Sequence, residues 1–298
     1  MAFAQGLGLP GLFDVHTHFL PPRVTAKVRQ QFDTAGPLIG SVWPLAYRGS
    51  DEELVATLRG FGVRRFSALP YAHRPDMAEF LNDWAFDFAG RTPGCLRSAT
   101  FYPEPGAAAY VDRRIGADTE VFKVHVQVGG FDVRDPQLRD VWGLLEEAGV
   151  PVVLHAGSGP VGTAHTGPGP VAELLGSHPR LALVIAHLGA PEYAEFLDLA
   201  DRHDQVRVDT TMVFTPFFDS LGEAFPPDLV PRLRDLQPKV LLGSDFPNIP
   251  YPYVEQLAGL ARLGLGDDWL RDVCWRNAAA LFGGATVECE SSGQRSYT

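Results

Sequence analysis

Short runs of apolar residues alternate with helix-period segments along the chain. Eight of these runs are rich in Val, Ile, Leu and Phe, have the length of a strand, and end in a polar or glycine-containing turn. The predicted strands cover residues 12–16, 63–69, 96–101, 120–126, 151–155, 181–187, 206–210 and 239–243. The segments between and after them predict helices at residues 51–61, 75–89, 136–148, 170–177, 191–203, 228–236 and 268–282.

Two of the predicted helices carry end signals. Ser50 and Glu53 have the spacing of a capping box in front of the helix over residues 51–61. Asp267 is the expected N-cap of the last helix, and Gly283 stands where a glycine just past the helix end is expected.

The regular alternation of strands and helices predicts a parallel sheet joined by helical crossovers. Several strands, such as PVVLH and LALVIAH, are apolar on both faces, as a sheet covered by helices requires. Eight such units favour an α/β fold of the closed (β/α)8 TIM-barrel type over an open doubly wound sheet. We expect a single domain over residues 1–283 and a weakly ordered tail over residues 284–298, because no linker marks a second domain.

The charge balance argues against one class of partner. The chain has 298 residues, with 25 Lys and Arg against 36 Asp and Glu, a formal net charge of −11, and no block of basic residues. An acidic chain of this kind lacks the charge that holds a phosphate backbone. Nucleic acid is therefore not an expected partner.

The cysteines and the N-terminus indicate the cellular compartment in which we expect the protein. Cysteines at positions 95, 274 and 289 form no close pair, which argues against a disulfide framework and a thiolate zinc site. The N-terminus has no signal-peptide pattern, and no run of about 18 apolar residues occurs. We expect a cytoplasmic protein without a membrane partner that acts on a small molecule. The oligomeric state is open, a homo-oligomer included.

Five of the nine histidines and one aspartate lie at or just after the carboxyl ends of predicted strands. These residues are His16, His18, His125, His155, His187 and Asp245. In a (β/α)8 barrel the active site is built at this end, whereas the opposite end serves stability. His178 and His203 precede strands and belong to the opposite end, while His73 and His165 fall in loops on the active-site side.

The spacing of the rim residues indicates a metal site. Alternate strand residues point to one side, so Asp14, His16 and His18 share a face, and imidazoles at i and i+2 can reach one ion. A third histidine and a carboxylate complete a nitrogen and oxygen shell suited to zinc, with manganese or iron(II) as alternatives. The predicted ligands of one divalent ion are His16, His18, His155 and Asp245.

The catalytic roles follow from the same rim. His187 is the expected acid/base or water-orienting group, because an imidazole transfers protons near neutral pH. Asp245 is expected to accept protons as well as to bind the metal. The assignments of His155 and His187 can be exchanged, and the spacing leaves both versions open.

Four further residues have open roles. Asp14 either orients a histidine from behind or makes a structural hydrogen bond. Lys123, on a strand face with His125, is a bridging carboxylated lysine of a two-metal site, a substrate-binding cation, or a buried partner of Asp14. Arg48, near Trp43 in the long first loop, suits a planar carboxylic acid together with aromatic residues after the seventh strand. Those aromatics otherwise pack the loops or a subunit interface.

The motifs FDVHTH, PVVLH, LVIAHLG and GSDFP, in this order, resemble the metal-dependent amidohydrolase superfamily. The most similar branch is the amidohydrolase-related group that includes aminocarboxymuconate-semialdehyde decarboxylase and resorcylate decarboxylases, and WRNAAALFG is similar to its C-terminal helix. The resemblance spans residues 11–283. It implies a (β/α)8 barrel with one divalent metal, often zinc, at the positions of His16, His18, His155 and Asp245, and it places the strand-six histidine at His187.

Two reactions use such a site. In a hydrolase, a metal-activated water attacks an ester, lactone or amide carbonyl while His187 or Asp245 moves protons. In a non-oxidative metal-dependent decarboxylase, an aromatic or unsaturated carboxylic acid is protonated at carbon and loses CO2. We favour the hydrolase, the majority reaction of the superfamily, with a catalytically silent metal-binding barrel as a further alternative. No GxGxxG or GxxxxGKS/T pattern follows the first strand, so a nucleotide enzyme is not expected.

Overall fold

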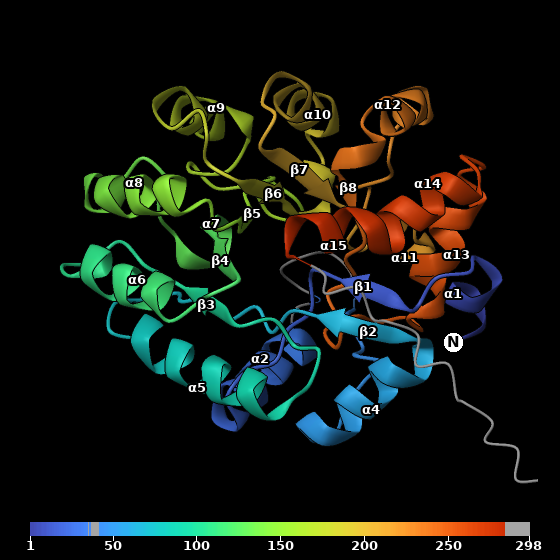
Figure 1. Cartoon of the computed structure of the whole chain (residues 1–298), viewed down its shortest axis with the longest axis horizontal. Coiled ribbons are helices and arrows are strands. Elements are labelled where there is room, and N and C mark those ends of the chain that lie inside the picture. The colour runs from blue at the N-terminus through green and yellow to red at the C-terminus, as the bar shows by residue number, and fades with distance from the viewer. Residues whose placement is uncertain (35, 37–41, 284–298) are drawn as a thin grey trace, which may run out of the picture.

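Eight strands form a ring at the centre of the molecule, with the helices around it (Figure 1). The computed structural model describes residues 1–34, 36 and 42–283. The predicted tail, and Cys289 within it, lie outside the described residues. The strands are β1 (Leu12–Asp14), β2 (Val63–Phe66), β3 (Ser98–Thr100), β4 (Val121–His125), β5 (Val152–His155), β6 (Leu183–Ile185), β7 (Val206–Asp209) and β8 (Val240–Leu241).

The ring is a closed parallel barrel. β1 pairs with β2, and the strands β3 to β8 pair in sequence order, all in parallel. Main-chain hydrogen bonds join these two sheets at both seams, from Leu96 N to Phe66 O at 2.8 Å and from Val15 N to Leu242 O at 2.9 Å. The predicted (β/α)8 fold is therefore confirmed.

The longer helices lie outside the ring and the shorter ones connect them to the strands. The α-helices are α1 (Ala2–Gly6), α2 (Pro22–Thr34), α4 (Asp51–Phe61), α5 (Ala78–Arg91), α6 (Ala107–Gly116), α7 (Val126–Gly129), α8 (Arg139–Ala148), α9 (Pro168–Ser177), α10 (Tyr193–Arg202), α11 (Pro216–Ser220), α12 (Val230–Asp235), α13 (Val254–Arg262), α14 (Asp267–Arg271) and α15 (Asn277–Leu281). Single turns of other helix types are η1 (Pro136–Leu138), η2 (Ala186–Gly189), η3 (Pro227–Leu229), η4 (Gln237–Lys239) and the π-turn η5 (Asp272–Arg276).

The predicted end signals are correct in part. In the capping box of α4, Glu53 N donates to Ser50 Oγ at 3.3 Å, and Ser50 N donates to Glu53 Oε2 at 2.8 Å. The prediction for the last helix is wrong at its start, because its N-cap is Gly266 and Asp267 is already helical. The predicted single helix consists of α14, η5 and α15, and Gly283 beyond it has a φ of 63°, the left-handed value expected there.

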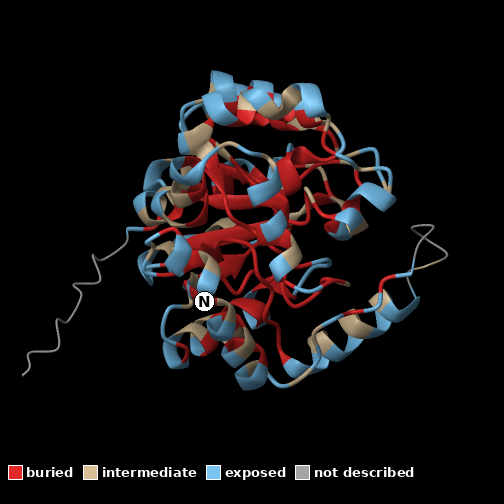
Figure 2. Ribbon diagram, turned by 90° about the vertical axis from the view of Figure 1, so that its right-hand side faces the viewer, coloured by how far each residue is buried: buried red, intermediate tan, exposed pale blue. Residues whose placement is uncertain are grey.

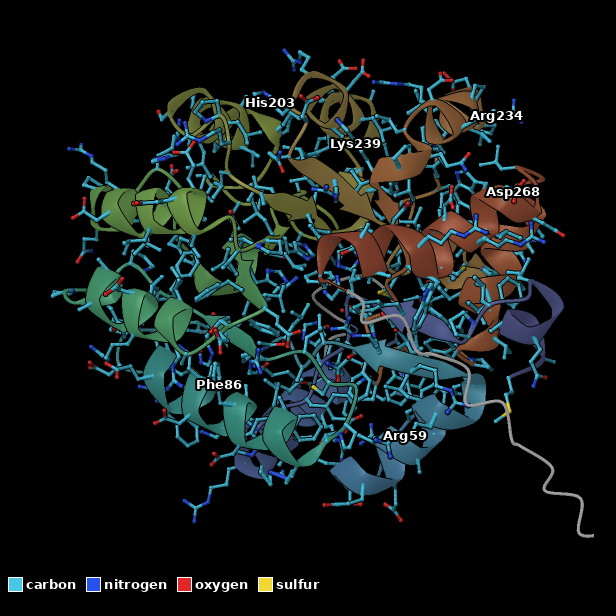
Figure 3. The ribbon with its side chains drawn as sticks, viewed as in Figure 1. Arg59, Phe86, His203, Arg234, Lys239 and Asp268 are labelled. Carbon is cyan, nitrogen blue, oxygen red and sulfur yellow. The ribbon has the colours of Figure 1, made fainter. Side chains whose placement is uncertain are left out.

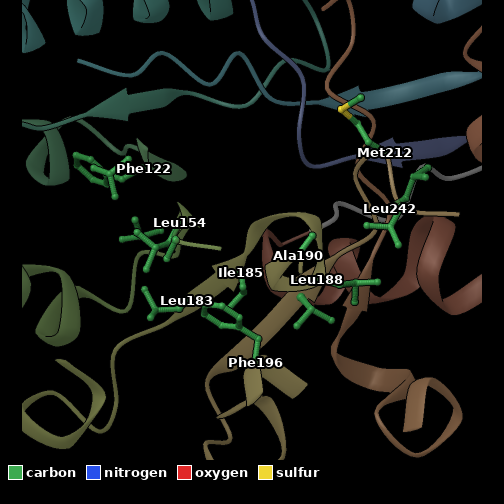
Figure 4. Packing of buried hydrophobic residues seen from close by; sticks show 14 of the residues in the cluster. Phe122, Leu154, Leu183, Ile185, Leu188, Ala190, Phe196, Met212 and Leu242 are labelled. Atoms are coloured by element: carbon green, nitrogen blue, oxygen red, sulfur yellow. The ribbon is translucent and has the colours of Figure 1, made fainter. Parts of the chain in front are cut away.

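Two hydrophobic cores hold the barrel together. The larger one lies between the strands and the surrounding helices, where Leu154 and Leu183 of neighbouring strands and Phe196 of α10 contribute (Figure 4). Figure 2 shows this buried interior enclosed by helices that are exposed on their outer faces. The smaller core fills the barrel itself and includes Ala278 and Phe282 of the C-terminal segment. The amino end of the barrel is therefore plugged by α15, which leaves the carboxyl ends of the strands for a site.

Within the described part of the chain, no helix combines the length and the apolar character that a membrane crossing needs.

Candidate active site

The main chain brings two of the predicted residues to the rim in an unusual conformation. His187 lies in η2 with a φ of 55°, and Asp245 follows β8 with a φ of 70°. Residues other than glycine adopt such left-handed values rarely, and they do so mostly where the surrounding structure holds them. His187 N donates to Asp209 Oδ1 at 2.9 Å, and Asp245 N donates to His16 O at 2.8 Å. Both strand ends are thus tied to neighbouring strands.

Three rim imidazoles point one ring nitrogen away from the site. The Nδ1 atoms of His16, His18 and His187 lie at 2.8 Å from Asp209 Oδ2, 2.8 Å from Leu69 O and 3.0 Å from Thr211 O, respectively. Carbonyl oxygens and an ionised carboxylate only accept hydrogen bonds. Each Nδ1 therefore carries a proton and donates, and each Nε2 is left to face the site.

The Nε2 atoms face a shared carboxylate. Asp245 Oδ1 lies 2.9 Å from His18 Nε2 and 3.3 Å from His16 Nε2. One ligand atom from each of His16, His187 and Asp245 lies within 4.8 Å of the other two. Acceptor atoms this close need protons or a cation between them, and imidazole nitrogens with a carboxylate form a donor set that zinc prefers. The residues present thus fit a divalent metal ion.

Burial sets the charges of these groups. Burial, and then the charge of Lys123, lower the pKa of His16 to about 3, and burial also lowers the pKa of His187. Burial raises the pKa of Asp245, but its contacts with His18 and the other imidazoles outweigh this and hold the pKa well below the usual range. The centre therefore combines the neutral rings of His16 and His187 with an anionic carboxylate, the states that bind a metal.

Lys123 reaches the same centre from β4. Its side chain is fully buried, and its Nζ lies 3.1 Å from His16 Nε2. Burial lowers the pKa of Lys123 to about 8. The lysine thus contacts a predicted ligand, whereas Asp14, the alternative partner, is engaged elsewhere.

Asp14 supports the strand end from behind. Its Oδ1 accepts from His16 N at 3.1 Å, and its Oδ2 accepts from Ser244 Oγ at 2.5 Å and from Tyr253 Oη at 2.9 Å. Burial raises the pKa of Asp14 to about 7. The carboxyl group touches the main chain of His16 and not its ring, so it holds the end of β1 in place.

His125 and His155 form a separate pair. They are register partners on β4 and β5, and their rings stack with centroids 3.8 Å apart and planes at 13°. The ring of His155 lies 4.7 Å from that of His187, but its Nε2 is turned toward Gly159 O at 3.4 Å. Burial lowers the pKa of both stacked imidazoles well below the usual value. The predicted ligand His155 therefore lies beside the centre. Its hydrogen bond is made by Nε2, whereas His16, His18 and His187 each make one through Nδ1.

Arg48 is not among the groups that the structure gathers at the centre. It forms an ion pair with Asp33 of α2, and about half of each side chain is exposed. The aromatic residues of the loops pack on one another: Trp43 contacts Phe217 with ring centroids 4.9 Å apart. Phe218 lies closer to the site, with its ring nearly parallel to that of His187 at a centroid distance of 6.1 Å. The apolar side of the rim is thus next to His187.

The structure also adds a residue that the histidine pattern missed. Asp209 ends β7, is fully buried, and bonds both His16 and the main chain of His187. Burial raises its pKa, but the charge and the hydrogen bond of His16 outweigh burial and bring it to about 2. The strand-end rule finds this residue when it is applied to the segment VRVD as well as to histidines.

The two histidines assigned to the opposite end are far from these groups. His178 pairs with Glu146 of α8 at 3.3 Å. His203 lies at the edge of the molecule next to Lys239, whose Nζ donates to His203 O at 3.1 Å (Figure 3). Both positions agree with a structural role.

Comparison with known proteins finds a family whose model matches most of the chain. The sequence profile of a family described as amidohydrolase matches residues 13–284. No curated protein matches the sequence.

Solved structures with the same fold differ widely in sequence. An uncharacterised TIM-barrel protein from Bordetella bronchiseptica has a TM-score of 0.70 and 18% identity, covering 91% of this chain and 98% of that one. A 2,6-dihydroxybenzoate decarboxylase from Rhizobium has a TM-score of 0.66 and 16% identity, covering 92% and 99%. A probable 2-pyrone-4,6-dicarboxylic acid hydrolase from Acinetobacter baumannii has a TM-score of 0.62 and 13% identity, with the same coverage. At such identities these likenesses concern the fold.

Proposed function

The chain belongs to the amidohydrolase family, and from this premise we propose that it is a metal-dependent hydrolase of a small organic substrate, cleaving an ester, lactone or amide bond. One observation carries the proposal. Three imidazoles each donate Nδ1–H to a fixed acceptor, which leaves their Nε2 atoms to face the rim, where those of His16 and His18 approach the carboxylate of Asp245. This is the arrangement in which outer hydrogen bonds orient histidines toward a metal ion.

We propose that His16, His18 and Asp245 bind one divalent ion, whichever of His155 and His187 is the remaining ligand. Zinc is the first candidate for this ion. One further imidazole completes the set, and the hydrogen-bond pattern favours His187 over His155 for that position. His187 and His155 thereby exchange the proton-transfer and ligand roles that the sequence spacing had left open. His155, whose ring centroid lies 4.7 Å from that of His187, is then the proposed proton-transfer group.

A divalent ion held by these residues would supply Lewis-acid chemistry, that is, a lower pKa for a water molecule and a polarised carbonyl oxygen. The side chains of the protein transfer the protons and stabilise the developing charge. Asp245, held anionic by its imidazole neighbours, accepts the proton of the attacking water. That proton then passes to the leaving group by way of His155, whose imidazole is neutral because burial lowers its pKa. Lys123 places a positive charge where negative charge develops on the substrate oxygen.

A second candidate function is non-oxidative decarboxylation of an aromatic or unsaturated carboxylic acid. The observation in its favour is the apolar side of the rim, where the ring of Phe218 is nearly parallel to that of His187. A planar substrate is held well by such a surface, and Lys123 supplies a cation for its carboxylate. The same residues serve both reactions, so the choice between them belongs to an assay.

The test is a paired screen of zinc-loaded protein. One arm measures hydrolysis of small esters, lactones and amides, and the other measures CO2 release from hydroxybenzoates and unsaturated diacids. We expect turnover in the hydrolysis arm, with loss of that turnover when His16 is replaced by Ala. CO2 release with no hydrolysis would establish the second candidate, and a zinc-loaded protein that is silent in both arms would contradict both.

A further inference from the structure

Asp209 occupies a position from which one carboxylate acts on two strand ends. We infer that Asp209 is a positioning residue that keeps His16 in the only tautomer able to bind a metal ion through Nε2. The inference rests on the proposed metal centre. It concerns this chain's own hydrogen bonds, so it is testable on metal-free protein.

The contacts of the carboxylate define its role. Asp209 Oδ2 lies 2.8 Å from His16 Nδ1, while Oδ1 accepts from His187 N at 2.9 Å and from Thr211 N at 3.1 Å. The side chain has no exposed surface, so water does not compete for these bonds. An ionised carboxylate has no proton to give, and His16 must therefore supply the proton from Nδ1.

Room for this pair depends on one glycine after β8. A Cβ atom at Gly243 would lie 2.9 Å from His16 Cβ, 3.3 Å from Asp209 Cγ and 2.1 Å from Thr211 Oγ1. The strand thus passes the pair at a distance that only glycine permits.

The tautomers of His18 and His187 are not set by a side-chain carboxylate at Nδ1. The Nδ1 partners of His18 and His187 are the main-chain oxygens of Leu69 and Thr211, which no side-chain substitution converts into donors. Of the three Nδ1 acceptors, only that of His16 belongs to a side chain. A single change at residue 209 therefore tests one ligand while the other two keep their tautomers.

Asparagine is the informative replacement because it keeps the shape of aspartate. Its Oδ1 still accepts from the main-chain N–H groups of His187 and Thr211. Its amide NH2 takes the place of Oδ2 and donates to His16 Nδ1, which must then be unprotonated. The imidazole proton moves to Nε2, and the nitrogen that faces Asp245 becomes a donor that cannot bind a metal ion.

The experiment uses the metal-stripped full chain labelled with 15N at histidine, with His16 assigned through a His16→Gln variant. Long-range 1H–15N spectra report which ring nitrogen is protonated. We expect Nδ1–H in the unsubstituted protein and Nε2–H in Asp209→Asn. Zinc affinity, measured by competition with a chelator, is expected to fall about 10- to 100-fold in Asp209→Asn. The melting temperature is expected to stay within a few degrees, since the shape is retained.

Asp14→Asn is the matched control. It makes the same chemical change beside the same histidine, but Asp14 bonds the main chain of His16 and not its ring. We expect the Nδ1–H tautomer of His16 to persist in this variant.

Three results would overturn the inference: Nε2–H at His16 in the unsubstituted protein, Nδ1–H retained in Asp209→Asn, or zinc affinity within twofold of the unsubstituted value in that variant. If Asp209→Asn does not fold, the spectrum of the unsubstituted protein still decides the tautomer. Failure of the unsubstituted protein to bind zinc, with the tautomers as expected, would overturn the proposed metal centre and leave the hydrogen-bond assignment standing.

Discussion

The two halves of the barrel rim present histidines in opposite ways. On the side of β1 and β6, the Nδ1 of each imidazole donates to a fixed acceptor and the Nε2 atoms face the site around Asp245. On the side of β4 and β5, His125 and His155 lie flat on each other at 3.8 Å. Both halves satisfy the strand-end rule equally. What separates them is the set of acceptors behind the rings.

This difference is our reason for proposing some strand-end histidines, and not others, as ligands. An imidazole binds a metal ion only when its other nitrogen is protonated and held, and three rim histidines meet that condition. The stacked pair instead places two neutral imidazoles beside the centre, since burial keeps the pKa of both rings well below the usual value. We therefore propose the first half as the metal-binding side and the second half as the source of the proton-transfer group.

The largest expected effect is the loss of the metal from the first half. Asp245→Ala removes the carboxylate that faces His16 and His18, and we expect bound zinc to fall from about one ion per chain to none, with turnover abolished. Metal analysis of the purified variant checks this. Asp83→Ala, which removes a mostly exposed carboxylate on α5, is the matched control and is expected to keep its zinc. Full zinc content in Asp245→Ala would remove this residue from the centre.

The second effect is acid sensitivity of the metal-free protein. Burial lowers the pKa of four rim histidines below the ordinary value of 6.5, so they bind protons in the unfolded chain and not in the folded one; these are His16, His125, His155 and His187. Their contribution to stability is present above pH 6.5 and is lost as the pH falls, for His16 toward about 3.

Asp14 acts in the opposite direction. Its pKa is raised from 3.8 to about 7 in the folded protein, so between these values it releases a proton on unfolding. Urea unfolding at pH 5 is thus expected to take up a net positive number of protons, because the histidines with lowered pKa outnumber the one aspartate that releases a proton. The slope of unfolding free energy against pH measures this number. A slope near zero between pH 6 and pH 4 would show that the imidazoles are charged in the folded state.

The third effect compares the two histidines whose roles are exchangeable. We expect His187→Ala to weaken zinc binding by roughly 100-fold, because His187 has the fixed Nδ1–H bond of a ligand. His155→Ala is expected to retain zinc within about tenfold and to lose turnover. Zinc titration and steady-state rates on both variants measure the difference. The reverse pattern would give His155 the ligand role implied by the family resemblance.

The smallest expected effect concerns Arg48. Its pairing with Asp33 is about half exposed, and such pairs contribute little, about 0–1 kcal/mol. Arg48→Ala is therefore expected to change turnover less than about twofold and the unfolding free energy by less than about 1 kcal/mol. A large rise of KM in this variant would instead restore Arg48 as a substrate-binding cation.

The fold was predictable because the strands of a covered parallel barrel are apolar on both faces. All eight strands lie within the predicted ranges, each shorter than its apolar run. The helices that the pattern missed include α2, in which no residue is buried and Val24 and Phe32 pack only partly on the core. The pattern also missed α6 and α13, although both helices bury residues against the barrel.

The site was predictable only as far as its chain positions. His16, His18, His187 and Asp245 lie together as the strand-end rule requires. The Nδ1–H groups of these histidines are held by two main-chain oxygens, of Leu69 and Thr211, and by the carboxylate of Asp209. Main-chain oxygens have no sequence signature, and their direction follows from the closure of the barrel. The sequence therefore indicated which histidines reach the rim, but not which of them face a metal.

The central claim is that Nε2 atoms of rim histidines and the carboxylate of Asp245 meet on one divalent ion. A crystal structure of the zinc-loaded protein with anomalous data at the zinc edge tests it most directly. The account predicts one anomalous peak per chain, about 2.0–2.2 Å from Nε2 of His16 and His18 and from a carboxylate oxygen of Asp245. A zinc-loaded crystal without a peak at these atoms, with Lys123 Nζ still against His16 Nε2, would contradict it.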